Sequence, residues 1–235
     1  MKYVEIMKDF ELMLAPMENH TGPEFREVCY RKGADSTFTE MARISALSRN
    51  NKSTVEKIQI VRSVPTYIQL IGSNEKELEK FLDNFTPQKG FVGFNLNLGC
   101  PSPDMIQSGL GCALIKRISK VTKLVKVIQD HQYPVSIKLR LGMNAFEKKK
   151  KVYLTLIKEV NADFFIVHAR HGKETYHDPA DFTVYQECVN TGKVIIANGD
   201  IKTKDQIDYL KSIGVRGAMI GRVAIKNPDV FNELK

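Results

Sequence analysis

The sequence predicts an α/β protein, a single-domain (β/α)8 TIM barrel, on three observations. Eight short apolar stretches alternate with segments of helical periodicity along nearly the whole chain. The apolar stretches are continuous rather than alternating, which is typical of parallel strands buried on both faces. The length of 235 residues suits one such barrel. A doubly wound parallel sheet is the second possibility, because periodicity does not show whether a sheet closes.

The predicted strands share a high content of apolar, β-branched or aromatic residues. They are Leu12–Met17, Ser36–Met41, Thr66–Gly72, Phe91–Leu98, Pro134–Leu141, Asp163–Ala169, Val194–Asn198 and Ala218–Gly221. Helices are expected between them, most clearly at Asn74–Phe85, Lys120–His131, Ala145–Val160 and Thr203–Ile213.

Helix ends carry their own signals. Asn74 with Glu77, and Thr203 with Gln206, have capping-box spacing, and Gly214 suits a helix C-terminus. We find no linker or low-complexity segment. One domain over residues 1–235 is therefore expected, with a last short helix after Asn227-Pro228.

Composition indicates a soluble protein. The chain is 43% hydrophobic and 26% charged, as in ordinary globular proteins. No run approaches the roughly 20 apolar residues of a membrane span, and the N-terminal segment lacks the apolar core of a secretory signal. We expect a cytoplasmic protein.

The four cysteines show no paired spacing and no zinc-like cluster with histidine. Reduced thiols and no metal site are therefore expected. Cys29 and Cys188 lie in helical stretches, where a small buried residue is the usual reading. Cys112 is interpreted in the same way.

The net charge of +8 favours a polyanionic partner. Charge alone does not distinguish RNA binding from a merely basic surface. The lysine run at residues 148–151 follows Glu147 in a predicted helix, and an exposed helix face is the simplest interpretation of it.

Chemistry in a barrel of this kind occurs at the C-terminal ends of the strands. Seven of the eight predicted strands end in residues that suit a site. These are Ala15-Pro16-Met17, Gln69, Asn95 to Pro101, Lys138 with Arg140, His168 to Arg170, Asn198-Gly199-Asp200 and Gly221-Arg222. Their convergence on one rim predicts an active site there.

Two turns near the end of the chain indicate a phosphate site. Gly199 and Gly221 allow close approach of the backbone to a ligand, and Arg222 adds a charged donor. Phosphate binding after strands seven and eight recurs in this fold. The alternative is that both glycines only form tight turns.

Cys100 lies between Gly99 and Pro101, in a loop after a buried strand, which favours a reactive thiol over a packing residue. Lys138 and His168 come from neighbouring strands and can face one ligand. A lysine near the pyrimidine edge of a flavin stabilises the reduced, anionic flavin. A buried structural histidine is the alternative for His168.

Taken in order, these motifs resemble the tRNA-dihydrouridine synthase family. The resemblance runs from about residue 11 to 232, and its most specific part is Asn97-Leu98-Gly99-Cys100-Pro101. The other matching segments are Ala15-Pro16-Met17, Thr39-Glu40-Met41, Gln69-Leu70, residues 138–142, Val167-His168-Ala169-Arg170, Tyr176, Asn198-Gly199-Asp200-Ile201 and Gly221-Arg222.

The resemblance implies FMN in the barrel mouth, reduced by NADPH or NADH, and reduction of a uracil ring in tRNA. It makes Cys100 the proton donor to C5 of that ring. The residues that would contact the flavin or its phosphate are Ala15, Pro16, Met17, Gln69, Lys138, His168, Asn198, Gly199, Asp200, Gly221 and Arg222. The residues that would contact the uracil are Asn97, Arg140 and Arg170.

The sequence departs from the family pattern in places. Asn95 replaces an acidic residue, His171 replaces a threonine and Gly22 replaces an aspartate. The family also continues into a helical domain that grips tRNA, whereas this sequence ends at Lys235, the pattern of a short form. Two alternatives follow: a flavin barrel that reduces a small molecule, and a non-catalytic phosphate- or RNA-binding barrel. Oligomeric state stays open.

Overall fold

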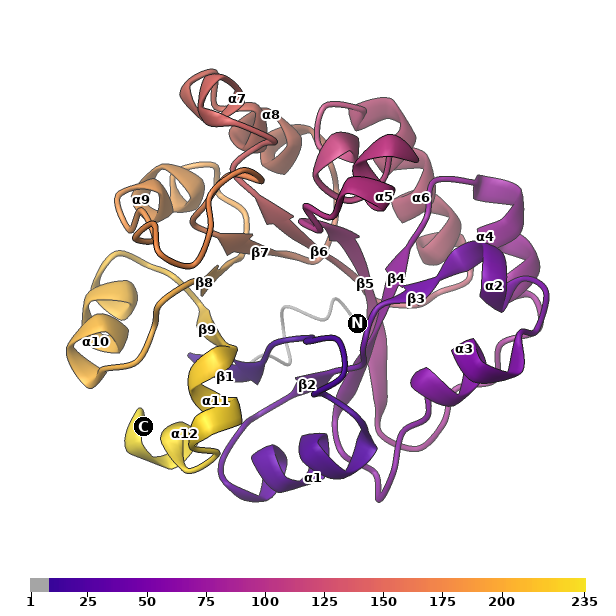
Figure 1. Ribbon diagram of the computed structural model, residues 1–235, viewed down its shortest axis with the longest axis horizontal. Helices are drawn as coiled ribbons and strands as arrows, with labels where there is room; N and C mark the ends of the chain where they lie inside the picture. Colours follow the sequence, from indigo (N-terminus) through magenta and orange to yellow (C-terminus); the bar gives the residue numbers. More distant parts are fainter. Residues whose placement is uncertain (1–8) are drawn as a thin grey trace.

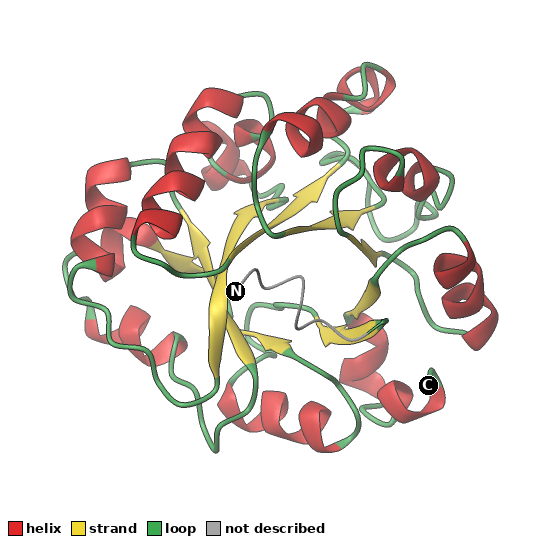
Figure 2. Ribbon diagram, turned by 180° about the vertical axis from the view of Figure 1, so that it is seen from behind, coloured by secondary structure: helices red, strands yellow, loops and turns green. Residues whose placement is uncertain are grey.

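The computed structural model describes residues 9–235 as a ring of parallel strands surrounded by helices (Figures 1 and 2). The strand order is β1-β9-β8-β7-β6-β5-β4-β2, with β3 also pairing with β4. A parallel bridge between Met13 and Ser36 links β1 to the segment before β2, with a 3.0 Å hydrogen bond from the amide of Leu14 to the carbonyl of Ser36. The sheet therefore forms a nearly closed barrel, as predicted, and not an open doubly wound sheet.

All eight predicted strands are present. With the additional short strand β3, the described residues form nine strands: β1 (Glu11–Leu14), β2 (Thr37–Phe38), β3 (Ala42–Arg43), β4 (Thr66–Ile71), β5 (Phe91–Leu98), β6 (Val135–Arg140), β7 (Phe164–His168), β8 (Ile195–Asn198) and β9 (Gly217–Ile220). The predicted second strand, Ser36–Met41, is shorter than expected and is followed by β3. The chain leaves the ladder at Thr39, whose hydroxyl accepts a hydrogen bond from the amide of Gln69 at 3.0 Å.

Helices follow the strands and cover the outside of the ring. They are α1 (Pro23–Arg31), α2 (Ile44–Leu47), α3 (Lys52–Lys57), α4 (Glu75–Leu82), α5 (Pro103–Gln107), the 3-10 helix η2 (Gly111–Leu114), α6 (Ile118–Asp130), α7 (Ala145–Lys149), α8 (Val152–Glu159), α9 (Val184–Val189), α10 (Lys204–Ser212), α11 (Arg222–Lys226) and α12 (Val230–Glu233). Within the described residues, no helix is both long and apolar enough to span a membrane.

The predicted helix Ala145–Val160 is wrong as a single element. It is broken into α7 and α8 at Lys151, which adopts a left-handed conformation with φ of 52°. The lysine run is therefore not one exposed face. Lys148 is partly buried and lies 3.0 Å from the carboxylate of Asp181, and Lys151 pairs with Glu187 on α9.

The core has two layers. One lies between the strands and the helices. The other fills the barrel interior with Met13, Ala15, Phe38, Tyr67, Phe164, Ile166, Ile196 and Met219. Tyr67 stacks on Phe38 with ring centroids 4.7 Å apart and meets Phe164 edge-on at 5.5 Å. These side chains pack the barrel interior, so it is a core and not a channel.

The capping box at α10 is confirmed, with reciprocal hydrogen bonds between Thr203 and Gln206. At α4 the side chain of Asn74 accepts from the amides of Lys76 and Glu77. Gly214 follows α10 with φ of 85°, as a C-terminal glycine should.

We expect Thr203→Ala to lower the free energy of unfolding by about 1 kcal/mol, because the amide of Gln206 loses the hydroxyl that caps it. Thr203→Ser keeps the hydroxyl and should stay within about 0.5 kcal/mol of wild type. Urea denaturation measures both changes, and equal losses in the two variants would contradict the capping role.

Candidate active site

Strand register brings the predicted site residues together. Asn97 pairs with Lys138 across β5 and β6, Arg140 pairs with His168 across β6 and β7, and His168 pairs with Asn198 across β7 and β8. Side chains two apart on a strand share a face, so Lys138 and Arg140 both point inward. One rim therefore carries cationic, imidazole and amide groups side by side.

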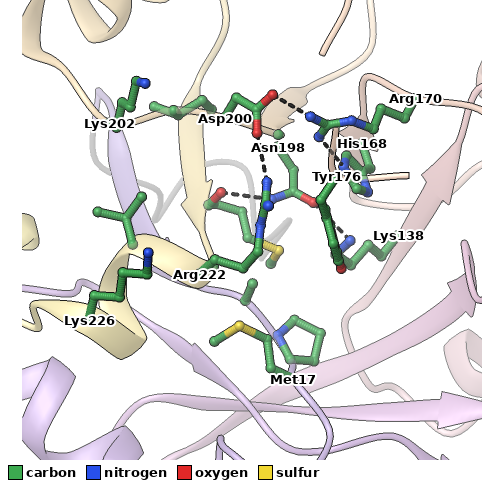
Figure 3. Close-up of a pocket in the computed structure, with 17 residues that line it drawn as sticks. Met17, Lys138, His168, Arg170, Tyr176, Asn198, Asp200, Lys202, Arg222 and Lys226 are labelled. Carbon is green, nitrogen blue, oxygen red and sulfur yellow. Dashed lines mark hydrogen bonds and ion pairs between the residues drawn. The ribbon is translucent and has the colours of Figure 1, made fainter. Parts of the chain in front are cut away.

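Two adjoining cavities open at this rim, and Pro16, Lys138, His168 and Tyr176 line both. The larger has a volume of about 470 Å³ and extends toward β8, β9 and α11 (Figure 3). The smaller, of about 190 Å³, extends toward Cys100, Asn97 and Arg140. Every residue predicted for the site lines one cavity or both.

A chain of buried amides holds Asn97 in place. Asn95 donates to the hydroxyl of Ser136 at 2.8 Å and accepts from the Gln69 amide at 2.7 Å; Gln69 in turn accepts from Asn97 at 2.9 Å. Asn95 thus acts as donor and acceptor together, which an ionised carboxylate cannot do. The departure from the family's acidic residue at position 95 is accommodated by this relay.

Asn97 fixes the loop that carries Cys100. Its side-chain oxygen accepts hydrogen bonds from the amides of Gly99 and Cys100, each at 3.0 Å. The Cys100 thiol is partly exposed at the smaller cavity and lies 3.5 Å from the hydroxyl of Ser102. A side chain at position 97 that lacked this acceptor would leave two loop amides without a partner.

The other cysteines are buried packing residues, as predicted. Burial raises the pKa of the Cys29, Cys112 and Cys188 thiols to about 12. Cys112 points its sulfur at the carbonyl of Gly99, 3.2 Å away. None of these thiols is an accessible nucleophile at neutral pH.

Lys138 lies where the two cavities meet and donates a 2.9 Å hydrogen bond to the side chain of Asn198. Burial, followed by the charge of Arg140, lowers the pKa of Lys138 from 10.5 to about 7. Lys138 therefore responds strongly to any anion placed beside it, because such an anion restores the charged form.

His168 is a neutral imidazole. Burial lowers its pKa first, and the charges of Lys138 and Arg140 add to the effect. The guanidinium of Arg170 lies 3.2 Å from Nε2. Since arginine can only donate, Nε2 accepts and the ring proton is on Nδ1, which leaves a donor for a ligand.

Arg170 is fully buried and takes part in three contacts. Besides His168, it donates to the carbonyl of Asp178 at 2.8 Å and forms an ion pair with Asp200. It lines the larger cavity but not the smaller. The structure thus places it apart from Cys100, although the sequence grouped it with the substrate residues Asn97 and Arg140.

The far end of the larger cavity is strongly cationic. Arg222 donates to Asp200 at 2.8 Å, and its guanidinium stacks 3.8 Å above the ring of Tyr176 (Figure 3). Lys202 and Lys226 line the same cavity. Asp200 is already engaged by Arg170 and Arg222, so its carboxylate offers nothing to a phosphate and only its backbone can contribute.

The backbone conformation and the close neighbours at position 199 require glycine. Its φ is 119°, and a Cβ there would come within 3.0 Å of the His168 ring. At Gly221, by contrast, a Cβ would meet only ordinary contacts with Met17 and Ala15. The close approach that the sequence suggested for both turns is required only at position 199.

Some residues that line the two cavities were not predicted as site residues, although Met41 and Tyr176 lie in segments that match the family pattern. Tyr176, Lys202 and Lys226 line the larger cavity, and Glu18 and Met41 line the smaller. A signal existed for Lys226, which follows Arg222 by one helical turn on the same face of α11. Tyr176 lies far from any strand end, and no periodicity indicates it.

We expect Gly111→Ala to displace Cys100. Gly111 has φ of 57°, and a Cβ there would lie 2.3 Å from the Cys100 carbonyl. Gly109 is the matched control, because it also has positive φ, 70°, with nothing within 4 Å of an added Cβ. Both variants should lose about 1–2 kcal/mol from backbone strain. Maleimide labelling of Cys100 should change rate only in Gly111→Ala, and equal rates in both variants would contradict the steric argument.

We expect Lys138 to make stability depend on pH. Its folded pKa, about 7, lies below the unfolded value of 10.5, so the unfolded chain binds more protons between these values. The folded state therefore gains stability as pH rises through that window. The free energy of unfolding of wild type minus that of Lys138→Met should increase from about pH 6.5 to 8.5 in urea denaturation. A difference that does not change with pH would contradict this.

Comparison with known proteins agrees with the geometry. The family model "Dihydrouridine synthase (Dus)" matches residues 13–235. A probable tRNA-dihydrouridine synthase of Aquifex aeolicus is 29% identical over 97% of this chain and 73% of its own length. A human tRNA-dihydrouridine(47) synthase [NAD(P)(+)]-like protein is 28% identical over 96% of this chain and 35% of its own length.

Among solved structures, nitroalkane oxidase from Streptomyces ansochromogenes has the same fold, with a TM-score of 0.58 and 11% identity over 93% of this chain and 66% of its own. That likeness concerns the fold alone. The family match, by contrast, covers the barrel and every strand end that lines the two cavities. The chain belongs to the dihydrouridine synthase family.

Proposed function

We propose that this protein is a flavin-dependent tRNA-dihydrouridine synthase of the cytoplasm. It would reduce the C5–C6 double bond of a uridine in tRNA, using FMN and NADPH or NADH. The observation that carries the proposal is the shared rim: Cys100 lines one cavity, the cationic turns line the next, and Lys138 and His168 line both.

The residues present fit FMN. The larger cavity, about 470 Å³, is within the range of roughly 300–1,000 Å³ typical of cofactor sites. Its far end presents Lys202, Arg222 and Lys226, and its single carboxylate, Asp200, is neutralised by two guanidinium groups. An anionic phosphate suits that end, and a flat ring suits the junction beside Pro16.

Bound FMN would supply the hydride that is added to C6 of the uracil. Lys138 would place a positive charge beside the flavin, and the negative charge of the reduced flavin would raise the depressed pKa of that lysine. His168 offers its Nδ1 proton as a hydrogen-bond donor. Met17 and Ala15 provide apolar contacts on the strand opposite.

Cys100 would complete the reaction from the smaller cavity. Its thiol would transfer a proton to C5, so that one hydride and one proton saturate the double bond, and the thiolate would then regain a proton from water. Asn97 holds the Cys100 loop, and Arg140 directs a guanidinium into the same cavity. Arg140 would donate to a uracil carbonyl oxygen, and Asn97, whose amide hydrogens already bond Gln69 and Met41, would contact the ring from the same cavity.

The RNA partner is supported by charge and by chemistry. The chain carries a net charge of +8, which favours a polyanion through counterion release. A base stacked in an RNA helix cannot reach a thiol that lines a cavity of the protein, so the target uridine would be flipped out. The smaller cavity, of about 190 Å³, would receive the extruded pyrimidine ring.

We expect Cys100→Ala to retain FMN and its reduction by NADPH or NADH, while reduction of uridine falls by about 10²–10⁴, the usual contribution of a positioned general acid. Cys188→Ala is the control, since that thiol is buried on α9 and lines neither cavity. Flavin absorbance follows the first half-reaction and dihydrouridine analysis of the RNA follows the second. Undiminished uridine reduction in Cys100→Ala would refute the role.

The visible spectrum of the purified protein tests the cofactor directly. Flavin bands that are lost or weakened in Arg222→Ala would support the assignment of the cationic end to the phosphate. A colourless protein that does not bind added FMN would overturn the proposal. Reduction of a small enone with no reduction of RNA would favour the alternative of a small-molecule reductase.

A further inference from the structure

A long loop, residues 171–181, forms one wall of the site between β7 and α9. Its backbone carbonyls at His171 and Glu174 accept hydrogen bonds from Nη1 of Arg140, at 2.9 and 3.2 Å. In the middle of the loop, Tyr176 lines both cavities. The direction of the Arg140 guanidinium therefore depends on the conformation of this loop.

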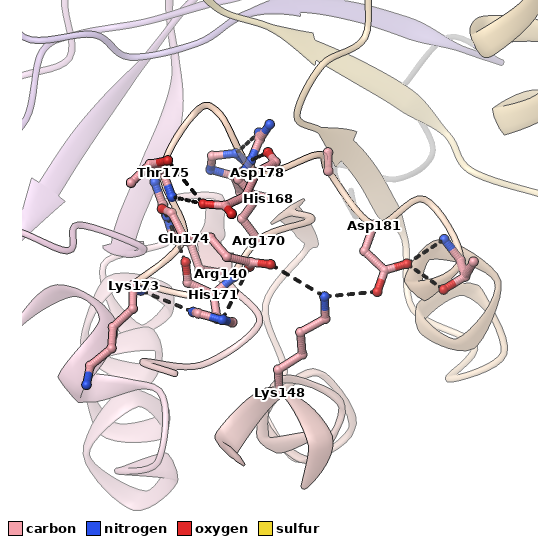
Figure 4. A network of polar contacts seen from close by, with 12 residues as sticks. Arg140, Lys148, His168, Arg170, His171, Lys173, Glu174, Thr175, Asp178 and Asp181 are labelled. Atoms are coloured by element: carbon pink, nitrogen blue, oxygen red, sulfur yellow. Dashed lines mark hydrogen bonds and ion pairs between the residues drawn. The ribbon is translucent and has the colours of Figure 1, made fainter. Parts of the chain in front are cut away.

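Lys148, on α7, connects the two ends of this loop (Figure 4). Its ammonium lies 3.0 Å from the carboxylate of Asp181 and 3.8 Å from that of Glu174. The three side chains are only 26%, 30% and 18% exposed. Because both carboxylates reach one ammonium, they lie close to each other and would repel without it.

Each carboxylate also has a second hydrogen-bond partner, within the loop for Glu174 and just after it for Asp181. Glu174 accepts from the amide of His171, and Asp181 accepts from the amide and hydroxyl of Thr183. The amide of Asp181 donates to the carbonyl of Ala169 at 2.9 Å. A displaced Glu174 would therefore carry with it the carbonyls of residues 171 and 174 that hold Arg140.

The position of Lys148 is itself well defined. Asn144 caps α7 by accepting from the amide of Glu147 at 3.0 Å. Glu147 is 5% exposed, accepts from the amide of Met143 at 2.8 Å and pairs with Lys116 at 2.7 Å. These contacts hold the N-terminus of α7 in place. The residues just before the helix also pair with the loop, because the amides of Gly172 and Lys173 donate to the carbonyls of Gly142 and Met143 at 2.8 and 3.1 Å.

We infer that Lys148 is a positioning residue, which neutralises Glu174 and Asp181 and so holds the 171–181 loop in the conformation that aims Arg140 at the substrate. The identity of the substrate in this inference rests on the proposed function. The effect of Lys148 on the loop conformation is independent of that function. Lys148 lines neither cavity, so its effect must pass through its two carboxylate partners.

The kinetic test compares Lys148→Met with Lys149→Met, which removes the same charge from an exposed neighbour on the same helix. We expect kcat/KM for RNA to fall about three- to tenfold in Lys148→Met and to stay near wild type in Lys149→Met. Flavin reduction should be unchanged in both, and Lys148→Arg should restore most of the loss. Equal losses in the two methionine variants would show simple attraction of RNA and overturn the inference.

A second substitution tests whether repulsion between Glu174 and Asp181 causes the loss of activity in Lys148→Met. Asp181→Asn removes one of the two negative charges, so the double variant Lys148→Met/Asp181→Asn should be more active than Lys148→Met alone. Additive losses would overturn the inference, because they would mean that the lysine and the aspartate act independently.

A third measurement needs no enzymatic activity. Trypsin can cut after Lys173 inside the loop, and the fragment beginning at Glu174 identifies that cut by mass. The cut should form several-fold faster in Lys148→Met than in Lys149→Met or wild type. Faster cleavage with no uridine reduction by wild type would reject the proposed function and keep the loop's mechanics. Equal cleavage rates would reject the inference itself.

Discussion

The concentration of positive charge at one rim of the barrel is the constraint on which the site depends. Lys138, Arg140, Arg170 and Arg222 surround a neutral His168, and all four charges act to lower its pKa. Such crowding is costly unless each cation has a partner. The carboxylate of Asp200 pairs with both Arg170 and Arg222, and backbone carbonyls accept hydrogen bonds from Arg140. These contacts offset the cost.

The positive charge of Lys138 is compensated less fully than the charges of the arginines, and this difference suits the binding of an anion. Its partner is the neutral amide of Asn198, so burial depresses its pKa toward neutrality. A site of this kind gains most from a ligand that brings negative charge. The phosphate, the reduced flavin and the polyanionic substrate of the proposed function would each bring negative charge to this rim.

Two separate systems position the reactive groups. A buried relay of neutral amides, from Ser136 to Asn97, fixes Cys100 on the side of β4 to β6. A network of ions and carbonyls, centred on Arg140 and the 171–181 loop, fixes the opposite wall. The first is mostly buried, with Asn95 and Gln69 almost fully shielded from solvent. The second is partly exposed, so it is the wall that can respond to single charge changes.

The sequence by itself determined the alternating strands and helices and the strand ends that line the site, because parallel strands buried on both faces leave continuous apolar runs, and the reactive residues follow those runs. Closure of the sheet is seen only in the tertiary structure, because periodicity carries no signal for it. Only the tertiary structure decided the break at Lys151, the buried clamp of Arg170 on His168 and Asp200, and the place of Tyr176. These depend on contacts between residues far apart in the chain. Ion pairs such as Lys148 with Asp181 leave no period in the sequence, so no local pattern could have revealed them.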